Sequence, residues 1–552
     1  MKSKLVRIIS MLIATLLLLS IFGCASKDNS TQLAASTGDA KKEGPSWTWD
    51  TSPVELTWFV NENWYTRAAW DVVKNPLDKA ITEKTGVKIK FSSSVGSTGD
   101  DKLNVMLASG ELPDLVTQSR YVPAFNVLQT SGKFAPLMEL IDKYAPTFKK
   151  DISNSMVSWY TQPDGKWYSY MNYFFPMEKM KNFKLSTNVF SAARKDILDS
   201  LGLKPDDFTT QEKAFNAFKK VKDSGIMQKG KALIPWLDWY QYDGYFYFPG
   251  IPAEDSSGNL IDIRRHPQYL DCAKWLNKCY NAGLLCNDAF TASGVSQLQE
   301  IFASGRVFFI SGNVAEVGAA MQTLYKKDHI QYVPVGPIKI NDQMPKPWVW
   351  SIGSAGWQGV FISNNSTHKD RAIRLLEFMA SKEGNMLCNY GIEGVTYTLG
   401  SNGRVEWTKE YLDALAKGGE MDKKFGTTGQ LTHCTDPILM KNTEPLPVLP
   451  EQKAYQAIPD YWSNYTYNEM AFSNTDPPAT TKEGAILPKL NQAFNEPKLI
   501  IAKPGDVEKL YKEMLDKQDK LGYQQVYDYQ NRTFKENKVK LGVEFAYPIN
   551  IK

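Results

Sequence analysis

The sequence lacks the short motifs of the most common enzyme classes. It has no G-x-S-x-G turn for a nucleophilic serine, no G-x-x-x-x-G-K-[ST] phosphate loop, no H-E-x-x-H zinc motif and no G-x-G-x-x-G dinucleotide loop. No cofactor is therefore expected. A pair of carboxylates for glycoside hydrolysis needs only to meet in space, so the 60 acidic residues leave that alternative open.

Candidate metal ligands are also scarce. The chain has only four histidines: His266, His329, His368 and His433. They are scattered, and we expect surface or helix-capping roles for them. Asp255–Asn259 is slightly similar to a calcium loop, but its glycine is in the fourth position and no glutamate follows at the twelfth. We expect a plain turn there, and no metal site.

Cysteine is rare as well. Apart from Cys24, the cysteines are Cys272, Cys279, Cys286, Cys388 and Cys434. Cys272 and Cys279 lie seven residues apart in a predicted helix, which separates them by about 10.5 Å, too far for a disulfide. No C-x-x-C pair typical of structural zinc sites is present. We predict buried free thiols, with a Cys279–Cys286 disulfide as the alternative.

The sequence has little excess charge of either sign. Lys and Arg total 64 and Asp and Glu total 60, a formal net charge of +4. Lys2, Lys4 and Arg7 belong to a segment that we expect to be removed, which leaves a charge of +1. Nucleic-acid binders need a surplus of positive charge to face the phosphates, so this balance argues against a nucleic-acid partner.

The first residues have the pattern of an export signal. Lys2, Lys4 and Arg7 form a basic start, and Ile8–Phe22 is an apolar stretch of 15 residues. A membrane span needs about 20 apolar residues, so this stretch is too short for one. We assign residues 1–23 to a lipoprotein signal peptide.

The four residues that end at Cys24 resemble the bacterial lipobox, in which a small residue precedes the cysteine that receives the lipid. The resemblance implies acylation of Cys24, palmitate included. The alternative is an ordinary signal peptide that is cut at another small residue such as Ala25. Ala25–Ser46 has one leucine and no aromatic residue, too little apolar surface to offset the entropy of ordering it. We therefore expect residues 24–46 to be a flexible tether that holds the protein at the extracellular face of the cell membrane.

From Val54 onward, strand and helix patterns alternate. Val54–Val60 is a β-rich run, Val87–Phe91 alternates with period two, and Leu112–Val116 resumes a strand. Arg67–Thr85 carries apolar residues at helical spacing, and we expect Pro76 to bend or divide that helix. This order of strands and helices predicts a βαβ layout with parallel strands.

A second group of strands and helices follows. Val189–Ala193 is typical of a strand, Thr209 with Glu212 predicts a capping box, and Ser366 or Thr367 is expected to cap a later helix. The aromatic-rich stretches 159–175 and 236–248 are interpreted as loops or crossings. We predict an α/β protein of two lobes that share several crossovers, with the ligand in the cleft outside the carboxyl ends of the strands.

The expected lobe boundaries follow from these groups. Residues 47–175 form the first part of lobe 1 and residues 176–340 the first part of lobe 2. Residues 341–450 return to lobe 1 and include the hinge crossings, and residues 451–552 form a C-terminal helical part that belongs mainly to lobe 2.

Eight short stretches of the body carry a likeness to one known family. In chain order they are Leu107–Leu115, Phe134–Asp142, Tyr144–Pro146, Asp164–Tyr168, Arg194–Leu198, Leu201–Leu203, Phe302–Val307 and Asn389–Gly394 with Tyr397. Together they resemble the extracellular solute-binding proteins of family 1, and within them the large lipoproteins of the lipo-oligosaccharide-binding type. The resemblance implies a periplasmic-binding-protein-like fold whose lobes close on a ligand in a hinged cleft.

The resemblance also implies a function. Proteins of this type capture an oligosaccharide without catalysis and deliver it to the permease of an ABC importer, and we expect a monomer. Two other functions remain as alternatives, a secreted polysaccharide-degrading enzyme and a peptide-binding component of an importer. An enzyme would generate new reducing ends, whereas a binding protein would leave the glycan intact.

Aromatic residues are frequent, with 15 Trp, 27 Tyr and 26 Phe, and they supply the flat faces that pack on sugar rings. Asn61 and Trp64 follow the first strand at its carboxyl end and are predicted to contact the ligand. Arg67 is a candidate partner for an acidic sugar, with a solvated arginine at the start of a helix as the alternative. Gln118 and Arg120 follow the Leu112–Val116 strand and are candidates by position.

A second set of candidates lies further along the chain. Trp236, Trp239, Tyr240 and Tyr245 belong to the densest aromatic patch, where interleaved polar residues suggest a partly wet wall. Trp357 precedes a strand, and its alternative role is packing between lobes.

Glu393 lies on a Gly391–Gly394 turn. We consider it a ligand or hinge residue, and the alternative is a structural acid of that turn.

Overall fold

The computed structural model describes residues 43–94, 99–180, 185–239, 245, 249–292, 295–351, 355–417, 424–426, 430–478 and 480–548. The expected signal peptide, the lipidated Cys24 and most of the expected tether lie outside these residues. Within the described ranges, no helix is long and apolar enough to cross a membrane.

The folded chain begins earlier than the sequence predicts. Ser46 was expected to end the tether, yet it is fully buried, and its backbone N–H donates to Thr147 Oγ1 at 2.7 Å. The next residue, Trp47, packs edge-on against Phe378 with 5.0 Å between the ring centroids. The last residues of the predicted tether are therefore part of the fold.

The first sheet has the strand order β2-β1-β3-β12-β4. Its strands are β1 (Val54–Val60), β2 (Val87–Ser93), β3 (Leu115–Ser119), β4 (Tyr170–Met171) and β12 (Gln358–Ile362). β1 runs parallel to both β2 and β3, which confirms the predicted βαβ layout. β12 returns from far along the chain and pairs antiparallel with β3 and β4.

The first long helix is shorter than predicted. A single or divided helix was expected over Arg67–Thr85, but α2 spans only Pro76–Thr85. Asn75 is its N-cap, and its side-chain oxygen accepts from the N–H groups of Leu77 and Asp78 at 3.0 and 3.2 Å. Proline at the first helical position has no N–H to leave unpaired, so it starts this helix rather than bending it.

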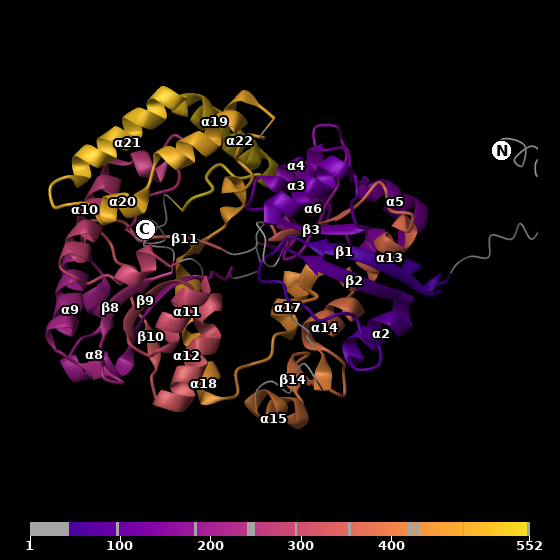
Figure 1. The fold of residues 1–552 in the computed structure, drawn as a ribbon, viewed down its shortest axis with the longest axis horizontal. Helices are drawn as coiled ribbons and strands as arrows, with labels where there is room; N and C mark the ends of the chain where they lie inside the picture. Colours follow the sequence, from indigo (N-terminus) through magenta and orange to yellow (C-terminus); the bar gives the residue numbers. More distant parts are fainter. Residues whose placement is uncertain are drawn as a thin grey trace, which may run out of the picture. The chain divides into compact units, whose positions relative to one another are not determined.

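Further helices accompany this sheet, most of them from the first part of the chain and two from residues 369–390 (Figure 1). They are α3 (Gly99–Ser109), α4 (Ala124–Thr130), α5 (Leu137–Tyr144), α6 (Asn154–Tyr160), α7 (Met177–Met180), α13 (Lys369–Ala380) and α14 (Lys382–Tyr390). α13 follows His368, whose side chain makes no capping bond. The expected cap, Ser366, instead donates to Asp114 and accepts from the N–H of His368.

The second sheet has the order β10-β5-β9-β8. Its strands are β5 (Val189–Arg194), β8 (Ile234–Asp238), β9 (Val307–Asn313) and β10 (Tyr332–Pro334). β8 and β9 are parallel, and β5 is antiparallel to both β9 and β10. All five residues of β8 are buried, so the expected loop at 236–248 begins with a core strand.

Most of the remaining helices accompany the second sheet or follow it in the chain. They are α8 (Lys195–Leu201), α9 (Gln211–Asp223), α10 (Pro267–Asn281), α11 (Val295–Ala303), α12 (Val314–Asp328), α15 (Lys409–Lys417), α17 (Pro437–Thr443), α18 (Pro450–Trp462), α19 (Lys482–Ala493), α20 (Glu496–Ile500), α21 (Val507–Leu521) and α22 (Tyr523–Leu541). Of these, α15 and α17 lie instead beside α14 and the pair of β13 (Tyr397–Leu399) and β14 (Val405–Trp407) (Figure 1). The N-cap of α9 is Thr210, one residue after the expected Thr209. His266 caps α10, as expected.

Three short strand pairs complete the fold. They are β6 (Met227–Gln228) with β7 (Lys231–Ala232), β11 (Val349–Trp350) with β15 (Thr466–Tyr467), and β13 (Tyr397–Leu399) with β14 (Val405–Trp407).

Each sheet has its own hydrophobic core. The first core draws buried side chains from residues 56–174, 355–434 and 470. The second draws them from residues 189–349 and 458–514. The five cysteines after Cys24 are buried and free, which confirms the expected thiols and excludes the Cys279–Cys286 alternative. Burial raises the pKa of Cys272, Cys279, Cys286, Cys388 and Cys434.

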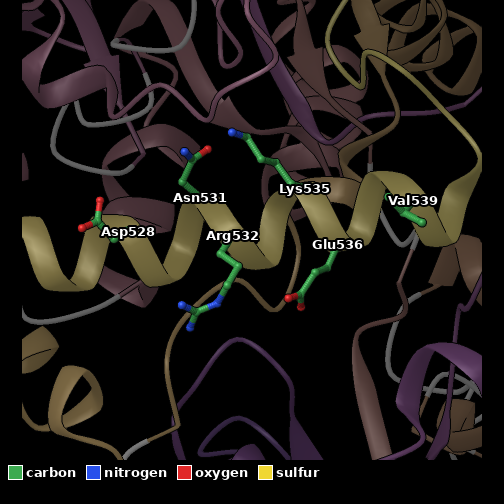
Figure 2. A pocket seen from close by; sticks show the side chains of 6 residues that line it. All are labelled: Asp528, Asn531, Arg532, Lys535, Glu536 and Val539. Carbon is green, nitrogen blue, oxygen red and sulfur yellow. The ribbon is translucent and has the colours of Figure 1, made fainter.

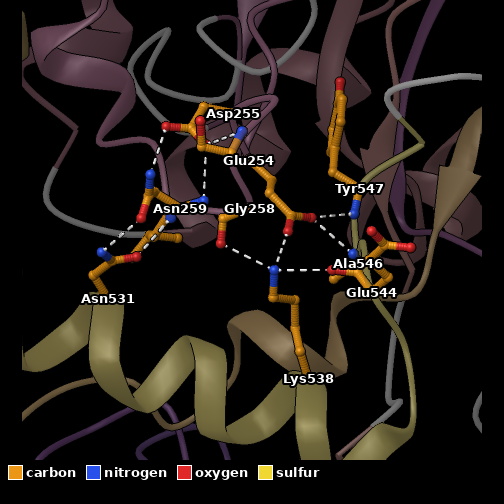
Figure 3. A network of polar contacts seen from close by, with 11 residues as sticks. Glu254, Asp255, Gly258, Asn259, Asn531, Lys538, Glu544, Ala546 and Tyr547 are labelled. Atoms are coloured by element: carbon orange, nitrogen blue, oxygen red, sulfur yellow. Dashed lines mark hydrogen bonds and ion pairs between the residues drawn. The ribbon is translucent and has the colours of Figure 1, made fainter.

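A buried ion pair fastens α22 to a distant loop (Figure 3). Lys538 Nζ donates to Glu254 Oε1 at 2.5 Å, to the Gly258 carbonyl at 2.9 Å and to the Glu544 carbonyl at 3.0 Å. The side chains of Lys538 and Glu254 are 9% and 0% exposed. The ammonium group is thus surrounded by three oxygen acceptors in place of water.

The second carboxylate oxygen of Glu254, Oε2, binds the segment that follows α22. It accepts from the backbone N–H groups of Ala546 and Tyr547 at 2.7 and 2.9 Å. Asp255, the next residue, accepts from the N–H groups of Ser257 and Asn259, so this segment forms the expected turn. One buried carboxylate therefore joins the turn, α22 and the C-terminal segment.

Replacement of Lys538 by Met leaves the Glu254 carboxylate buried without its counter-charge. We expect Lys538→Met to lower the free energy of unfolding by about 3–5 kcal/mol, because loss of one partner of a buried pair exposes the full desolvation cost of the other. Urea unfolding measures this loss. Lys520→Met, at an exposed position of α21, is the matched control and should change the stability by less than about 0.5 kcal/mol.

Candidate functional site

Polar and aromatic residues meet at one edge of the first sheet. Asn61 directly follows β1, Gln118 lies near the end of β3, and Trp357 directly precedes β12. The pairing of Val60 with Thr117 and of Gly359 with Gln118 places these ends side by side. We call Asn61, Trp64, Gln118, Arg120 and Trp357 the edge cluster.

Asn61 and Gln118 form the buried base of the edge cluster. The Asn61 side-chain amide donates to Gln118 Oε1 at 2.7 Å, and the two residues are only 8% and 1% exposed. The Asn61 side-chain oxygen has no hydrogen-bond donor among the described residues. Buried polar atoms in native proteins are normally paired, so this oxygen is an exception among the described residues.

Two tryptophans form the exposed face of the edge cluster. The rings of Trp64 and Trp357 stack with 5.7 Å between centroids and an interplanar angle of 17°. Trp357 is half-buried, whereas Trp64 keeps 47% of its surface exposed. Tyr173 lies beside Trp357, with 6.5 Å between the ring centroids. The exposed face of Trp64 is thus a flat apolar surface of the kind that packs on sugar rings, and Trp357 and Tyr173 support it.

A carboxylate holds Trp64 in place. Glu62 Oε2 accepts from the Trp64 indole N–H at 2.9 Å, and Glu62 Oε1 accepts from the Gln358 amide at 2.8 Å. Burial raises the pKa of Glu62, and the two hydrogen bonds partly oppose that rise. Glu62 therefore bridges the loop after β1 to the start of β12 and orients the exposed indole.

Arg120 supports the aromatic pair, and its positive charge is neutralised by an ion pair within the protein. Its backbone N–H donates to the Trp357 carbonyl at 3.0 Å, and its guanidinium pairs with Glu469 at 2.7 Å. The Arg120 side chain is 4% exposed. Burial raises the pKa of Glu469, and the positive charge of Arg120 opposes that rise. Arg120 thus positions Trp357.

Arg67 is not part of the edge cluster. Its guanidinium pairs with Asp78, and the two side chains are 2% and 0% exposed. The same guanidinium lies over the rings of Trp70 and Phe91. Both roles considered for Arg67, a ligand for an acidic sugar and a solvated arginine, disagree with this burial.

The aromatic patch predicted as a second binding wall lies largely in the second core. Trp236 and Tyr245 have no exposed surface, and Trp239 is 2% exposed. The Trp236 ring packs against Phe218 and Trp275 with centroid distances of 5.3 and 5.7 Å. None of these three presents a face to a ligand in this structure, because Trp236 lies in the buried strand β8 and all three belong to the second core.

The two remaining candidate ligand residues are Tyr240 and Glu393, and the structure describes only the second. Tyr240 lies outside the described residues. Glu393 is exposed on the loop between α14 and β13, where it forms an isolated bridge with Tyr397. Its ligand or hinge role stays a prediction.

The sequence analysis missed two residues that shape the edge cluster. Glu62 lies between Asn61 and Trp64 in the sequence. A carboxylate so close to a candidate stacking residue could have been used to predict a role for Glu62 in the site. Glu469 had no such signal, because its partner Arg120 is 349 residues away.

His433 is buried in the first core, in contact with Thr117, the neighbour of Gln118 in the edge cluster. Its ring lies 4.6 Å from Trp58 and 5.8 Å from Tyr65, and its Nδ1 is 3.3 Å from Thr117 Oγ1. Burial lowers the pKa of His433 to about 3. The expected surface or capping role is wrong for this histidine, which is 2% exposed and neutral.

A buried neutral histidine links stability to pH. Between pH 6.5 and about 3 the unfolded chain binds a proton at His433 that the folded chain does not. The free energy of unfolding should therefore fall with falling pH, by at most about 1.4 kcal/mol per unit from this residue. His433→Gln should give a shallower decrease in urea unfolding from pH 7 to 4. His329→Gln, at an exposed position, should keep the wild-type slope.

The comparisons with known proteins agree on a family. The sequence profile of bacterial extracellular solute-binding proteins matches residues 70–386. The polygalacturonan/rhamnogalacturonan-binding protein YtcQ of Bacillus subtilis is 26% identical over 346 residues, 59% of this chain and 65% of that protein. Lipoprotein LipO of the same species is 23% identical over 348 residues, 59% of this chain and 64% of LipO. The matches therefore span slightly less than two thirds of either relative.

Solved structures share the fold. The Streptococcus pneumoniae ABC-transporter substrate-binding protein FusA in complex with kestose has a TM-score of 0.66 at 15% identity, covering 88% of this chain and 100% of that one. The alginate-binding protein AlgQ2 has a TM-score of 0.61 at 19% identity, covering 88% and 98%. These likenesses confirm the expected periplasmic-binding-protein-like α/β fold.

Proposed function

This chain belongs to the bacterial extracellular solute-binding proteins, and we propose that it captures an oligosaccharide outside the cell and delivers it to an ABC permease without catalysing a reaction. The observation that carries this proposal is the stacked, half-exposed pair of Trp64 and Trp357 at the edge of the first sheet. The names of YtcQ, which binds polygalacturonan and rhamnogalacturonan, and of FusA, which was solved with kestose, support a carbohydrate ligand.

The edge cluster suits a sugar because it combines a fixed flat face with polar groups. Glu62 holds the Trp64 indole before any ligand arrives, so binding would order few side chains. The carboxylate of Glu62 lies next to that face, where it can accept hydrogen bonds from sugar hydroxyls. We therefore assign Trp64 the stacking role. We propose polar contacts for Asn61 and Gln118 as well, which require their mutual hydrogen bond to open, since the two residues are 8% and 1% exposed here.

Capture in this family requires two parts that move against each other. The chain passes from one core to the other within residues 175–188, 350–354 and 435–457, and Met470 makes one further contact with the first core before the chain returns to the second. We propose that these crossings form the hinge of a two-lobed monomer with the boundaries predicted from the sequence. Closure around an oligosaccharide would shift the population toward the form that the permease recognises.

Loss of the exposed indole should weaken binding. We expect Trp64→Ala to raise the dissociation constant for the bound oligosaccharide about tenfold or more, since a central aromatic contact is typically worth over 1 kcal/mol. Isothermal titration calorimetry measures this change. Trp407→Ala is the matched control, because Trp407 stacks on Tyr411 at 4.4 Å outside the edge cluster. Equal weakening by both variants would contradict the assigned role of Trp64.

The ligand class can be found by thermal unfolding of the purified chain with a panel of plant and bacterial oligosaccharides. A ligand at 100 times its dissociation constant should stabilise the fold by about 2.7 kcal/mol. Reducing ends are assayed in the same samples. New reducing ends would replace the transport proposal with the polysaccharide-degrading enzyme, and stabilisation by peptides alone would favour the peptide importer.

We also propose that lipid attached to Cys24 holds the protein at the extracellular face of the membrane. Cys24→Ala should move the protein from the membrane fraction to the medium, because the variant lacks the cysteine that receives the lipid. Immunoblotting of the two fractions measures this. Cys434→Ala, at a buried free thiol, is the control that should stay in the membrane fraction. Retention of the Cys24→Ala protein would contradict the lipid anchor.

A further inference from the structure

Two exposed aromatic rings lie at the same edge of the first sheet. Trp64 and Tyr121 keep 47% and 59% of their surface exposed. Every other tryptophan, tyrosine and phenylalanine that the structure describes is buried or half-buried. Soluble proteins bury most of their aromatic surface, so two open rings at one edge are not explained by packing and mark a surface for binding.

Tyr121 and Trp64 have corresponding positions on neighbouring strands. β1 and β3 are parallel, and Val60 of β1 pairs with Thr117 of β3. Trp64 follows Val60 by four residues, and Tyr121 follows Thr117 by four residues. Paired strands lie about 4.8 Å apart. The two rings therefore belong to loops that leave the sheet next to each other.

Trp357 joins the two loops. Its ring stacks on Trp64 with 5.7 Å between the centroids. Its carbonyl accepts from the backbone N–H of Arg120, the residue before Tyr121, at 3.0 Å. Consecutive Cα atoms are about 3.8 Å apart, so Tyr121 begins close to the Trp357 backbone. Trp64 thus lies at the ring of Trp357 and Tyr121 at its backbone.

One face of the Tyr121 ring is covered by a buried group. The guanidinium carbon of Arg120 lies 4.2 Å from the ring centroid, and the same guanidinium donates to the Tyr121 hydroxyl at 3.1 Å. The Arg120 side chain is 4% exposed and pairs with Glu469. Because Arg120 covers one face, the exposed surface of the ring lies mainly on its opposite face and its edges.

A charged residue therefore orients each of the two exposed rings. Glu62 accepts from the Trp64 indole N–H at 2.9 Å, and Arg120 packs against Tyr121. A ring that is held in place before binding loses little conformational freedom when a ligand stacks on it. Both rings also follow strands of the first sheet, so a hinge movement of the lobes leaves their separation unchanged.

We infer that Tyr121 stacks on a second sugar unit of the ligand, apart from the unit that stacks on Trp64. A single sugar ring covers one of the two faces and not both, because the Trp357 side chain lies between Trp64 and the backbone next to Tyr121. The ligand of the proposed function then spans more than one sugar ring. The inference rests on the proposed function and adds to it a binding residue and a minimum chain length.

The open hollow beside α22 supplies no comparable face. Six side chains of this one helix line it, and none of them is aromatic (Figure 2). Asn531, one of the six, already accepts from the Leu260 N–H at 2.9 Å and donates to the Asn259 side chain at 3.3 Å. The second stacking contact is therefore assigned to Tyr121.

The test measures affinity against the length of the sugar chain. Three series serve as probes, each running from the monosaccharide to the tetrasaccharide: β-1,4-linked galactose, β-1,4-linked xylose and α-1,4-linked galacturonic acid. Calorimetry on the purified chain gives the dissociation constants. In a series that binds, wild type should bind the tetrasaccharide at least about tenfold more tightly than the monosaccharide, because only the longer chain reaches both rings.

Tyr121→Ala should remove most of this gain. It should weaken binding of the tetrasaccharide about tenfold, as expected for loss of one aromatic contact, and leave binding of the monosaccharide unchanged. Tyr121→Phe keeps the ring and should bind as wild type does. Trp64→Ala should weaken binding of every length. The midpoint of thermal unfolding should be the same in Tyr121→Ala and wild type, because the ring is exposed.

Tyr529→Ala is the matched control. Tyr529 is half-buried on α22, outside the edge cluster, and the Arg532 guanidinium lies over its ring at 5.0 Å from the centroid. The control therefore also removes a tyrosine ring that packs against an arginine. Tyr529→Ala should bind every length as wild type does.

The outcomes separate this inference from the proposed function. Equal affinity of wild type for all lengths of a bound series would overturn the inference and leave sugar capture by Trp64 standing. Weakening of every length by Tyr121→Ala would also overturn it, because a second unit is absent from a monosaccharide. Unchanged binding in Tyr121→Ala with loss of sugar uptake by cells would overturn it in favour of a protein contact. Absence of binding to all three series and to the wider panel would overturn both.

Discussion

The parallel pairing of β1 with β3 is the constraint on which the candidate site depends. Parallel strands end at the same edge, so the polar residues after Val60 and Thr117 must meet there. Antiparallel β12 begins at this edge and adds Trp357 from far along the chain. A shift of register by one residue would turn the inward side chains of these strands outward, so core packing and site geometry are fixed together.

Buried charges in this protein are committed to structure. Arg67, Arg120 and Lys538 each neutralise a carboxylate that has little or no contact with water. Such pairs join segments far apart in sequence, and they are costly to break on one side alone.

Much of the fold was predictable from local pattern. Period-two alternation identified Val87–Phe91 as a strand, and the order of strands and helices predicted parallel pairing. The sequence-based predictions were wrong where the same residue type is compatible with two structural roles. Pro76 starts a helix because Asn75 caps it, and Trp236 lies in the core because β8 is buried on both faces, although polar neighbours in the sequence suggested a wet wall.

By itself the sequence determined the family, the α/β class and the residues after β1 that form the candidate site, because each depends on short-range order along the chain. Only the tertiary structure decided which aromatic rings stay exposed and which charges are buried in pairs. Those properties depend on partners hundreds of residues away, such as Glu469 for Arg120, and on burial within a core. No local pattern reports such contacts, since they arise from packing between distant segments.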